Sequence, residues 1–218
     1  MKRKILIVLG ILLLAQGFHL FANSYDEEAD IKKRTEARQN EKYEKAVFAG
    51  GCFWCMQPPF DYLDGVITTT AGYTGGPEKS PTYKEVSYGK TGHTEAVEVI
   101  YDPQKITYDK LLSVFWRSFD PTDADGQFYD RGQQYRPGIF YLNEDQKKAA
   151  ETSKKKLQES ERFDKPIVVE ITQADEFWDA EEYHQMYYLK KPMPYKTYRY
   201  GSGRDKFIDK YWGSQTKK

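Results

Sequence analysis

The chain has 218 residues, with 33 basic and 33 acidic side chains and a formal net charge of zero. This length supports one ordinary domain that builds its own core without disulfide reinforcement. The balanced charge, with no basic stripe interleaved with aromatic residues, argues against a nucleic-acid-binding protein. Aromatic residues make up 16% of the chain, a richness that suits a pocket with hydroxyl donors.

The N-terminus opens with Lys2, Arg3 and Lys4 and continues into an apolar run over residues 5–22. A basic start followed by an apolar stretch is typical of a secretory signal peptide. The run is also marginal for a membrane-spanning helix of about 20 residues, so an uncleaved anchor is the alternative. Both alternatives predict an exported protein, periplasmic or membrane-anchored and facing outward.

Residues 23–44 are highly charged and have no periodic apolar face, which predicts a solvated linker or a loose helix. The folded domain is expected over residues 45–212, followed by a polar tail at 213–218. Within the domain, apolar patterns predict strands at residues 45–48, 66–73, 94–101, 138–142 and 166–172. They predict helices that begin at Phe53, after Thr107 and after Asn143, and a short helix over residues 180–189. This mixture indicates an α/β or α+β sheet covered by helices. The long polar segment 120–136 is expected to be an irregular loop that carries function.

The two cysteines of the chain, Cys52 and Cys55, lie three positions apart directly after the first predicted strand. The glycine pair at residues 50 and 51 permits a sharp turn, so Cys52 is expected at or near a helix N-terminus. Unpaired backbone N–H groups and the helix dipole would favour a reactive thiolate there. The alternative is an inert buried cysteine pair or a small structural staple.

Four motifs in sequence order together resemble the A-type peptide methionine sulfoxide reductases. They are residues 51–54 (Gly-Cys-Phe-Trp), 92–97 (Gly-His-Thr-Glu-Ala-Val), 130–136 (Asp-x-Gly-x-Gln-Tyr-Arg) and 180–185 (Ala-Glu-Glu-Tyr-His-Gln). The resemblance covers residues 45–191. It implies an α+β fold, an α/β sandwich with a mixed sheet, flanking helices, extensive coil and a ferredoxin-like core. No second domain with paired C-x-x-C zinc motifs follows, so the chain does not resemble a fusion with the B-type reductase.

Reduction of a sulfoxide needs a soft nucleophile for sulfur and a proton for the departing oxygen. By resemblance, Cys52 supplies the first and Glu95 the second, provided that an apolar pocket raises the pKa of this carboxyl. Cys52 would become a sulfenic acid, which condenses with a nearby thiol. Cys55 is the only other thiol in the chain and would form the disulfide.

The resemblance also implies roles for five further residues. The phenols of Tyr83 and Tyr135 would hydrogen-bond the sulfoxide oxygen. Asp130 would orient a polar partner or a water, and Phe53 with Trp54 would form an apolar wall for the S-methyl group. No cofactor or metal is expected.

The chain departs from the family pattern at three places. Gln57 stands where Glu is frequent, and Phe128-Tyr129 precede Asp130 where Gly-Asn is common. The C-terminal tail has no cysteine, which leaves the resolving step to Cys55.

The expected partners are methionine sulfoxide, free or in oxidised proteins, and a thioredoxin or an exported thioredoxin-like reductant. The protein is expected to be a monomer. Two rival readings are a thioredoxin-like thiol–disulfide oxidoreductase and an exported binding module with an aromatic groove. A zinc site formed by the two cysteines with His93 and His184 is a third alternative, although the paired spacing usual for structural zinc is missing.

Overall fold

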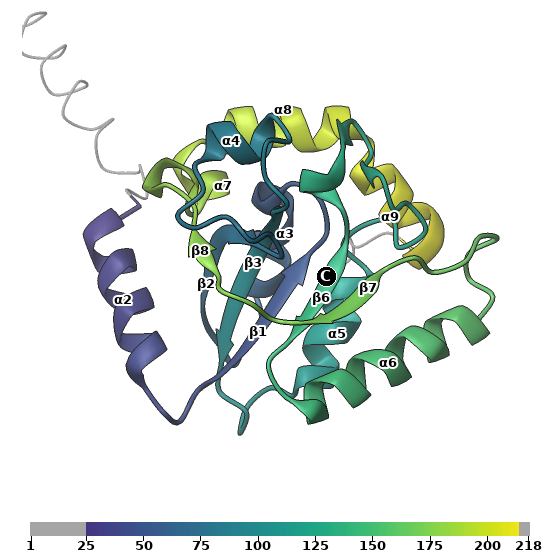
Figure 1. Ribbon diagram of the computed structural model, residues 1–218, viewed down its shortest axis with the longest axis horizontal. Coiled ribbons are helices and arrows are strands. Elements are labelled where there is room, and N and C mark those ends of the chain that lie inside the picture. Colours follow the sequence, from purple (N-terminus) through teal and green to yellow (C-terminus); the bar gives the residue numbers. More distant parts are fainter. Residues whose placement is uncertain (1–24, 214–218) are drawn as a thin grey trace, which may run out of the picture.

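The computed structural model describes residues 25–213 and centres on a six-stranded mixed sheet of order β7-β6-β1-β3-β2-β8 (Figure 1). Its strands are β1 (Glu44–Ala49), β2 (Val66–Thr74), β3 (Thr94–Tyr101), β6 (Gly138–Tyr141), β7 (Glu170–Gln173) and β8 (Trp178–Asp179). A small hairpin joins β4 (Gly126–Gln127) and β5 (Asp130–Arg131). The α-helices are α2 (Glu27–Gln39), α3 (Phe53–Asp61), α4 (Tyr83–Ser87), α5 (Tyr108–Trp116), α6 (Glu144–Glu159), α7 (Tyr187–Lys190), α8 (Pro192–Ser202) and α9 (Arg204–Trp212). The short 3₁₀ helices are η1 (Gln133–Tyr135) and η2 (Glu182–His184).

The central strands follow the connectivity β1-α3-β2-β3-α5-β6 and lie in the order β6-β1-β3-β2. All neighbours within this group are antiparallel, whereas β7 joins β6 in parallel. This is the ferredoxin-like arrangement with an added parallel edge strand. The predicted α+β fold class is therefore confirmed.

Alternation along β1 separates two apolar layers. Ala46 and Phe48 face the main core, where the Phe48 ring stacks on Phe60 of α3 at 5.3 Å and on Phe115 of α5 at 5.0 Å between centroids. Val47 and Ala49 face the other layer. Because α3 is held by this core directly after β1, the start of α3 is fixed at the end of the strand.

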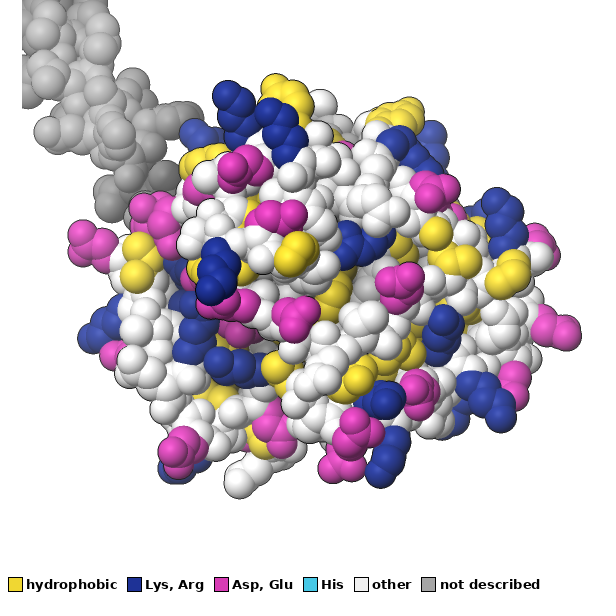
Figure 2. Space-filling model, in the orientation of Figure 1, with side chains coloured by type: hydrophobic (Ala, Val, Ile, Leu, Met, Phe, Trp, Pro, Cys, Tyr) yellow, Lys and Arg dark blue, Asp and Glu magenta, His cyan; other side chains and the backbone are white. Residues whose placement is uncertain are grey.

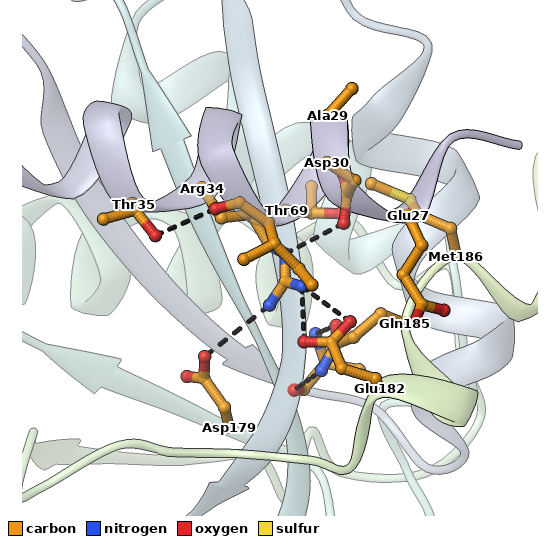
Figure 3. Close-up of polar contacts among 12 residues, drawn as sticks. Glu27, Ala29, Asp30, Arg34, Thr35, Thr69, Asp179, Glu182, Gln185 and Met186 are labelled. Atoms are coloured by element: carbon orange, nitrogen blue, oxygen red, sulfur yellow. Dashed lines mark hydrogen bonds and ion pairs between the residues drawn. The ribbon is translucent and has the colours of Figure 1, made fainter.

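A solvated linker or a loose helix was expected over residues 23–44. Residues 27–39 form the helix α2, which packs on the domain through ion pairs (Figure 3). The side chain of Arg34 is 4% exposed, and its Nη2 donates to both carboxylate oxygens of Glu182, at 2.6 and 2.8 Å. Its Nε donates to Asp30 at 2.9 Å. Arg38 bonds Glu98 at 2.7 Å and Asp179 at 2.6 and 2.8 Å. No apolar face reveals this docking, because charged groups provide it.

We expect Arg34→Met to weaken the attachment of α2. The substitution leaves the carboxylate of Asp30, which is 9% exposed, without its guanidinium partner. Since Glu182 is 40% exposed, water screens part of the loss, and the free energy of local opening should fall by about 1–3 kcal/mol. Hydrogen exchange of the α2 amides measures this. Lys32→Met removes the exposed Lys32–Glu36 pair of the same helix and should leave exchange unchanged. Equal effects of both substitutions would contradict the prediction.

Other differences from the predicted elements are local. The strand expected at 166–172 begins only at Glu170, and the expected helix at 180–189 is divided into η2 and α7. The polar segment 120–136 holds the β4–β5 hairpin and η1. Helices α8 and α9 were not predicted as separate elements. Thr107 and Asn143 cap α5 and α6 as expected.

Lys/Arg and Asp/Glu side chains are interspersed over the face of the domain shown in Figure 2, in keeping with the zero net charge. Between residues 25 and 213, no helix has the length and apolar character that crossing a bilayer requires. The predicted signal peptide or anchor at residues 1–22 lies outside the described residues.

Candidate active site

A tight turn between β1 and α3 presents the first cysteine. Gly51 has φ +81°, and a Cβ on it would lie 2.6 Å from Cβ of Gln127, so both conformation and space require glycine. Cys52 is the N-cap residue of α3, as expected from the sequence. Its carbonyl oxygen accepts from the N–H of Cys55 at 3.0 Å, which places Cys55 in the first turn of the helix.

Both cysteines are buried and unbridged, with Cys52 6% exposed and Cys55 fully buried. Burial, and then the hydrogen bond with Cys55, raise the pKa of Cys52. The hydrogen bond from Cys52 lowers the pKa of Cys55 to about 7, and the guanidiniums of Arg204 and Arg199 act in the same direction. Burial thus opposes the thiolate that the helix terminus was expected to favour on Cys52.

Glu95 explains why the helix terminus does not serve Cys52 directly. The N–H of Phe53 at the start of α3 donates to Oε2 of Glu95 at 3.0 Å, whereas Cys52 makes no side-chain capping bond. Glu95 shares the core face of β3 with Val97 and is 2% exposed. Burial raises the pKa of this carboxyl well above its ordinary range, which the Phe53 N–H only partly opposes. Glu95 is thus a buried carboxyl next to the cysteine turn, and burial favours its protonated form.

Thr94, the residue before Glu95, holds the segment that contains Tyr135. Its hydroxyl bonds the carbonyl oxygens of the two residues on either side of Tyr135, Gln134 at 3.2 Å and Arg136 at 3.1 Å. Tyr83 begins α4, and its N–H donates to Glu181 at 2.9 Å.

Burial, and then the charge of Glu95, raise the pKa of both Tyr83 and Tyr135, and Cys52 contributes in the same direction. Both phenols therefore lie in the field of Glu95 and Cys52 and remain protonated donors at neutral pH.

Asp130 lies in β5 and accepts a hydrogen bond from the phenol of Tyr198 in α8. Burial raises the pKa of Asp130, while this bond lowers it. Tyr198 was not predicted as a site residue. The only sequence signal for it is the tyrosine-rich stretch between residues 177 and 200.

An aromatic group surrounds the neutral imidazole of His184. Trp54 Nε1 donates to His184 Nδ1 at 3.1 Å, which leaves the imidazole proton on Nε2. Burial lowers the pKa of His184 to about 4. The rings of Phe53 and Tyr83 lie 5.0 and 4.3 Å from the imidazole, and Trp54 stacks on Tyr187 at 3.8 Å. Phe53 and Trp54 thus belong to one aromatic cluster.

Glu181 and Gln185, neither predicted individually, anchor η2. Glu181 accepts from the Tyr73 hydroxyl at 2.8 Å as well as from Tyr83 N–H. The Gln185 side chain pairs with both backbone groups of Ala71 at 2.8 Å. The fourth motif therefore ties the aromatic cluster to β2.

The two histidines of the zinc alternative are bonded to other groups than the cysteine pair. His93 bonds the carbonyl oxygen of Glu78 through Nε2 at 2.7 Å and accepts from Gly76 N–H at 3.3 Å, while His184 pairs with Trp54. Across residues 25–213, no three Cys, His, Asp or Glu side chains gather as a metal site requires.

A buried cysteine pair at a helix start, next to a buried carboxyl and two phenols, is the arrangement of a thiol-dependent oxidoreductase. Comparisons with known proteins specify the family. The family model for peptide methionine sulfoxide reductase matches residues 44–216. The peptide methionine sulfoxide reductase MsrA of Listeria monocytogenes is 56% identical over 172 residues, which cover 79% of this chain and 97% of the relative. The Bacillus licheniformis MsrA is 53% identical over 173 residues, 79% of this chain and 96% of the relative.

Two solved structures agree. The reduced form of Mxr1 from Saccharomyces cerevisiae has a TM-score of 0.66 and 34% identity, covering 70% of this chain and 87% of that chain. Methionine sulfoxide reductase A of Corynebacterium diphtheriae has a TM-score of 0.64 and 33% identity, covering 72% and 78%. The chain belongs to the peptide methionine sulfoxide reductase family, and it is an enzyme of the A type. The resemblance recognised from the four motifs is confirmed.

Proposed function

We propose that this enzyme reduces methionine-S-sulfoxide, free or in oxidised proteins, through a sulfenic acid on Cys52, and so repairs oxidative damage. The observation that carries the proposal is the contact between Glu95 Oε2 and Phe53 N–H at 3.0 Å. The contact holds the Glu95 carboxyl at the residue next to Cys52, which supports Glu95 as the proton donor and Cys52 as the nucleophile.

In the proposed first step, the proton of Cys52 shifts toward Cys55 across their hydrogen bond, and the Cys52 sulfur attacks the sulfoxide sulfur. Glu95 gives its proton to the oxygen, because an unprotonated sulfoxide oxygen is a poor leaving group. The oxygen ends on Cys52 as a sulfenic acid, and methionine leaves, reduced by two electrons. The phenols of Tyr83 and Tyr135 donate hydrogen bonds to the oxygen as charge develops on it.

The aromatic cluster provides the apolar surface for the substrate's methyl group. Phe53 is 1% exposed, whereas Trp54 is partly exposed and is held by His184. Asp130 and Tyr198 form the polar side of the same site and orient it. A small methyl group suits such an aromatic wall better than a charged head group does.

In the second step, the sulfur of Cys55 attacks the sulfur of the Cys52 sulfenic acid, and the proton that Cys55 took from Cys52 passes to the departing oxygen. The S–S bond forms, the S–O bond breaks, water leaves, and Glu95 regains its proton from solvent. A dithiol protein of the thioredoxin type then reduces the disulfide by thiol exchange. We propose that the domain acts as a monomer. If the basic and apolar N-terminus exports it, this reductant is an exported thioredoxin-like protein.

Turnover with the two epimers of methionine sulfoxide and dithiothreitol tests the proposal. We expect reduction of the S epimer and none of the R epimer. A thioredoxin-like oxidoreductase would reduce protein disulfides without consuming sulfoxide, and a binding module would do neither. Reduction of the R epimer alone would contradict the proposed specificity.

Cys55→Ser is expected to keep one turnover per enzyme and to lose recycling by a thioredoxin-like donor. Serine cannot form the disulfide, so the sulfenic acid should accumulate and react with dimedone. The single turnover should be slower than in the parent chain, because serine does not take up the proton of Cys52. Single-turnover methionine yield and mass spectrometry of the adduct measure this. Normal cycling of the variant with the protein donor would place the resolving step elsewhere.

A further inference from the structure

Helix α2 lies outside the part of the chain that the family model matches, which begins at residue 44. The helix nevertheless rests on residues 178–190, the motif-four segment. Arg34 bonds Glu182 of η2 at 2.6 and 2.8 Å and lies 3.6 Å from the carboxylate of Asp179 in β8. Figure 3 shows its guanidinium pointing from α2 toward both carboxylates. A helix that is extra to the family domain therefore contacts one of the four motifs of that domain.

Two further side chains extend this contact to both ends of the motif-four segment. Arg38 bonds both carboxylate oxygens of Asp179, at 2.6 and 2.8 Å, where β8 ends. At the other end, Nζ of Lys190 in α7 donates to Glu27 of α2 at 2.8 Å and also to the carbonyl oxygen of Glu182. The segment is thus connected to α2 at its start, its middle and its end.

The motif-four segment has little regular structure of its own. It consists of two residues of β8, three of η2, four of α7 and the turns between them. Met186, which joins η2 to α7, adopts φ +48°, a conformation that is unfavourable for a residue with a side chain. Such short elements depend on contacts with neighbouring elements to keep their positions.

The same segment holds the aromatic cluster of the candidate site. His184 accepts a hydrogen bond from Trp54 Nε1 at 3.1 Å, and the ring of Tyr187 stacks on the same indole at 3.8 Å. Glu181 accepts from the N–H at the start of α4. Glu182 is the next residue, and its carboxylate is held from α2. One turn of 3₁₀ helix is therefore fixed to the site by two side chains and to α2 by the third.

We infer that Arg34 is a positioning residue for substrate binding: through Glu182 it braces the motif-four segment and keeps the aromatic cluster in the position that receives the methyl group of the sulfoxide. The inference rests on the proposed function, from which the role of the cluster is taken. Arg34 touches none of the reacting groups. Cys52 and Glu95 belong to the start of α3 and to β3, which the main core holds, so the brace acts on substrate affinity more than on the chemical step.

The brace consists of charged groups, so its strength depends on salt. The side chain of Arg34 is 4% exposed, but those of Glu182 and Asp179 are 40% and 38% exposed. Raising the salt concentration from about 0.1 to about 1 M shortens the Debye length from about 10 to about 3 Å and weakens such pairs. The neutral hydrogen bonds between Gln185 and the backbone of Ala71 are much less sensitive to salt. A loss of affinity for an uncharged substrate at high salt is therefore the signature of the brace.

Single-turnover kinetics of the full chain, without reductant, test the inference. The substrate is N-acetyl-methionine-S-sulfoxide amide, which has no net charge, and rapid quench at several concentrations gives a half-saturation concentration and a limiting rate. Arg34→Met should raise the half-saturation concentration about threefold or more at low salt, change the limiting rate much less, and remove most of the salt dependence. Lys32→Met removes the exposed Lys32–Glu36 pair of the same helix and should leave all three quantities unchanged.

A double-mutant cycle tests the route from α2 to the site. Glu182→Gln removes the carboxylate that Arg34 bonds, so it should raise the half-saturation concentration to a similar extent. The double variant Arg34→Met with Glu182→Gln should be no worse than either single variant, because both substitutions break the same contact. Additive effects of the two substitutions would refute the route through Glu182.

Two other results would overturn the inference. One is an unmodified chain with the same half-saturation concentration at low and high salt, and this measurement needs no variant. The other is an Arg34→Met chain, folded by near-ultraviolet circular dichroism, that saturates like the unmodified chain. Failure of the proposed function is distinguishable, since the unmodified chain would then reduce no S-sulfoxide at any salt concentration.

Discussion

Cys52→Ser is expected to reduce sulfoxide turnover to the rate observed without enzyme, including the single stoichiometric turnover. A serine hydroxyl ionises far less readily than a thiol and is a poor nucleophile for sulfur. The buried Cys55 cannot replace it, because it lies in the first turn of α3 behind the N-cap position. Methionine release measured by rapid quench checks the prediction.

The fold of Cys52→Ser should be retained, since Cys52 makes no capping hydrogen bond and serine is a favourable N-cap residue. Near-ultraviolet circular dichroism is the control. Cys55→Ser is the matched variant, with the same chemical change three positions along the helix and an expected single turnover. Appreciable single turnover by a folded Cys52→Ser chain would refute the nucleophile assignment.

Glu95→Gln is expected to slow the sulfoxide step by roughly 10²–10⁴, the range for loss of a positioned general acid. The amide oxygen still accepts from Phe53 N–H, so the turn into α3 should persist while the acidic proton is lost. Formation of the Cys52–Cys55 disulfide from a preformed sulfenic acid should change much less. Separate rapid-quench measurements of methionine and of free thiol resolve the two steps.

The pH dependence gives a second test of Glu95. Burial raises the pKa of this carboxyl, so the acid form persists to higher pH, and the rate of the sulfoxide step should fall as pH rises through the raised pKa. Glu95→Gln should lack this limb. Glu98→Gln, on the opposite face of β3 and bonded to Arg38, should keep both the rate and the limb. An unchanged rate and pH profile in Glu95→Gln would move the proton donor to Tyr83 or Tyr135.

Local sequence patterns predicted much of the fold. Short apolar runs located β1, β2, β3 and β6, helical spacing located α5, and the capping residue Asn143 located α6. The same patterns allowed a loose helix in the segment of α2 but did not predict that it docks on the domain. Its stabilising contacts are charged and distant, as in Arg34 to Glu182, 148 positions apart, so no local window contains both partners.

In the candidate site, too, some residues could be predicted from the sequence and others could not. Cys52 and Cys55 stand out as the two thiols of the chain, and the resemblance to the A-type reductases pointed to Glu95, Tyr83 and Tyr135. Tyr198 could not be predicted, since a tyrosine in a tyrosine-rich helix becomes distinctive only when α8 places it on Asp130.

The sequence by itself determined the reactive groups, the glycine turn that leads to the cysteine, and the absence of cysteine in the tail. Only the tertiary structure decided their protonation, since pKa depends on burial and on charges brought together from distant segments. The dipole of α3 favoured a thiolate on Cys52, yet Glu95 takes the first N–H of the helix and burial raises the pKa of Cys52. The guanidinium of Arg204, 149 positions after Cys55, lies behind the cysteine turn and bonds the carbonyl oxygen of Gly50. A charge brought in from so distant a segment could not be placed from the cysteine motif alone.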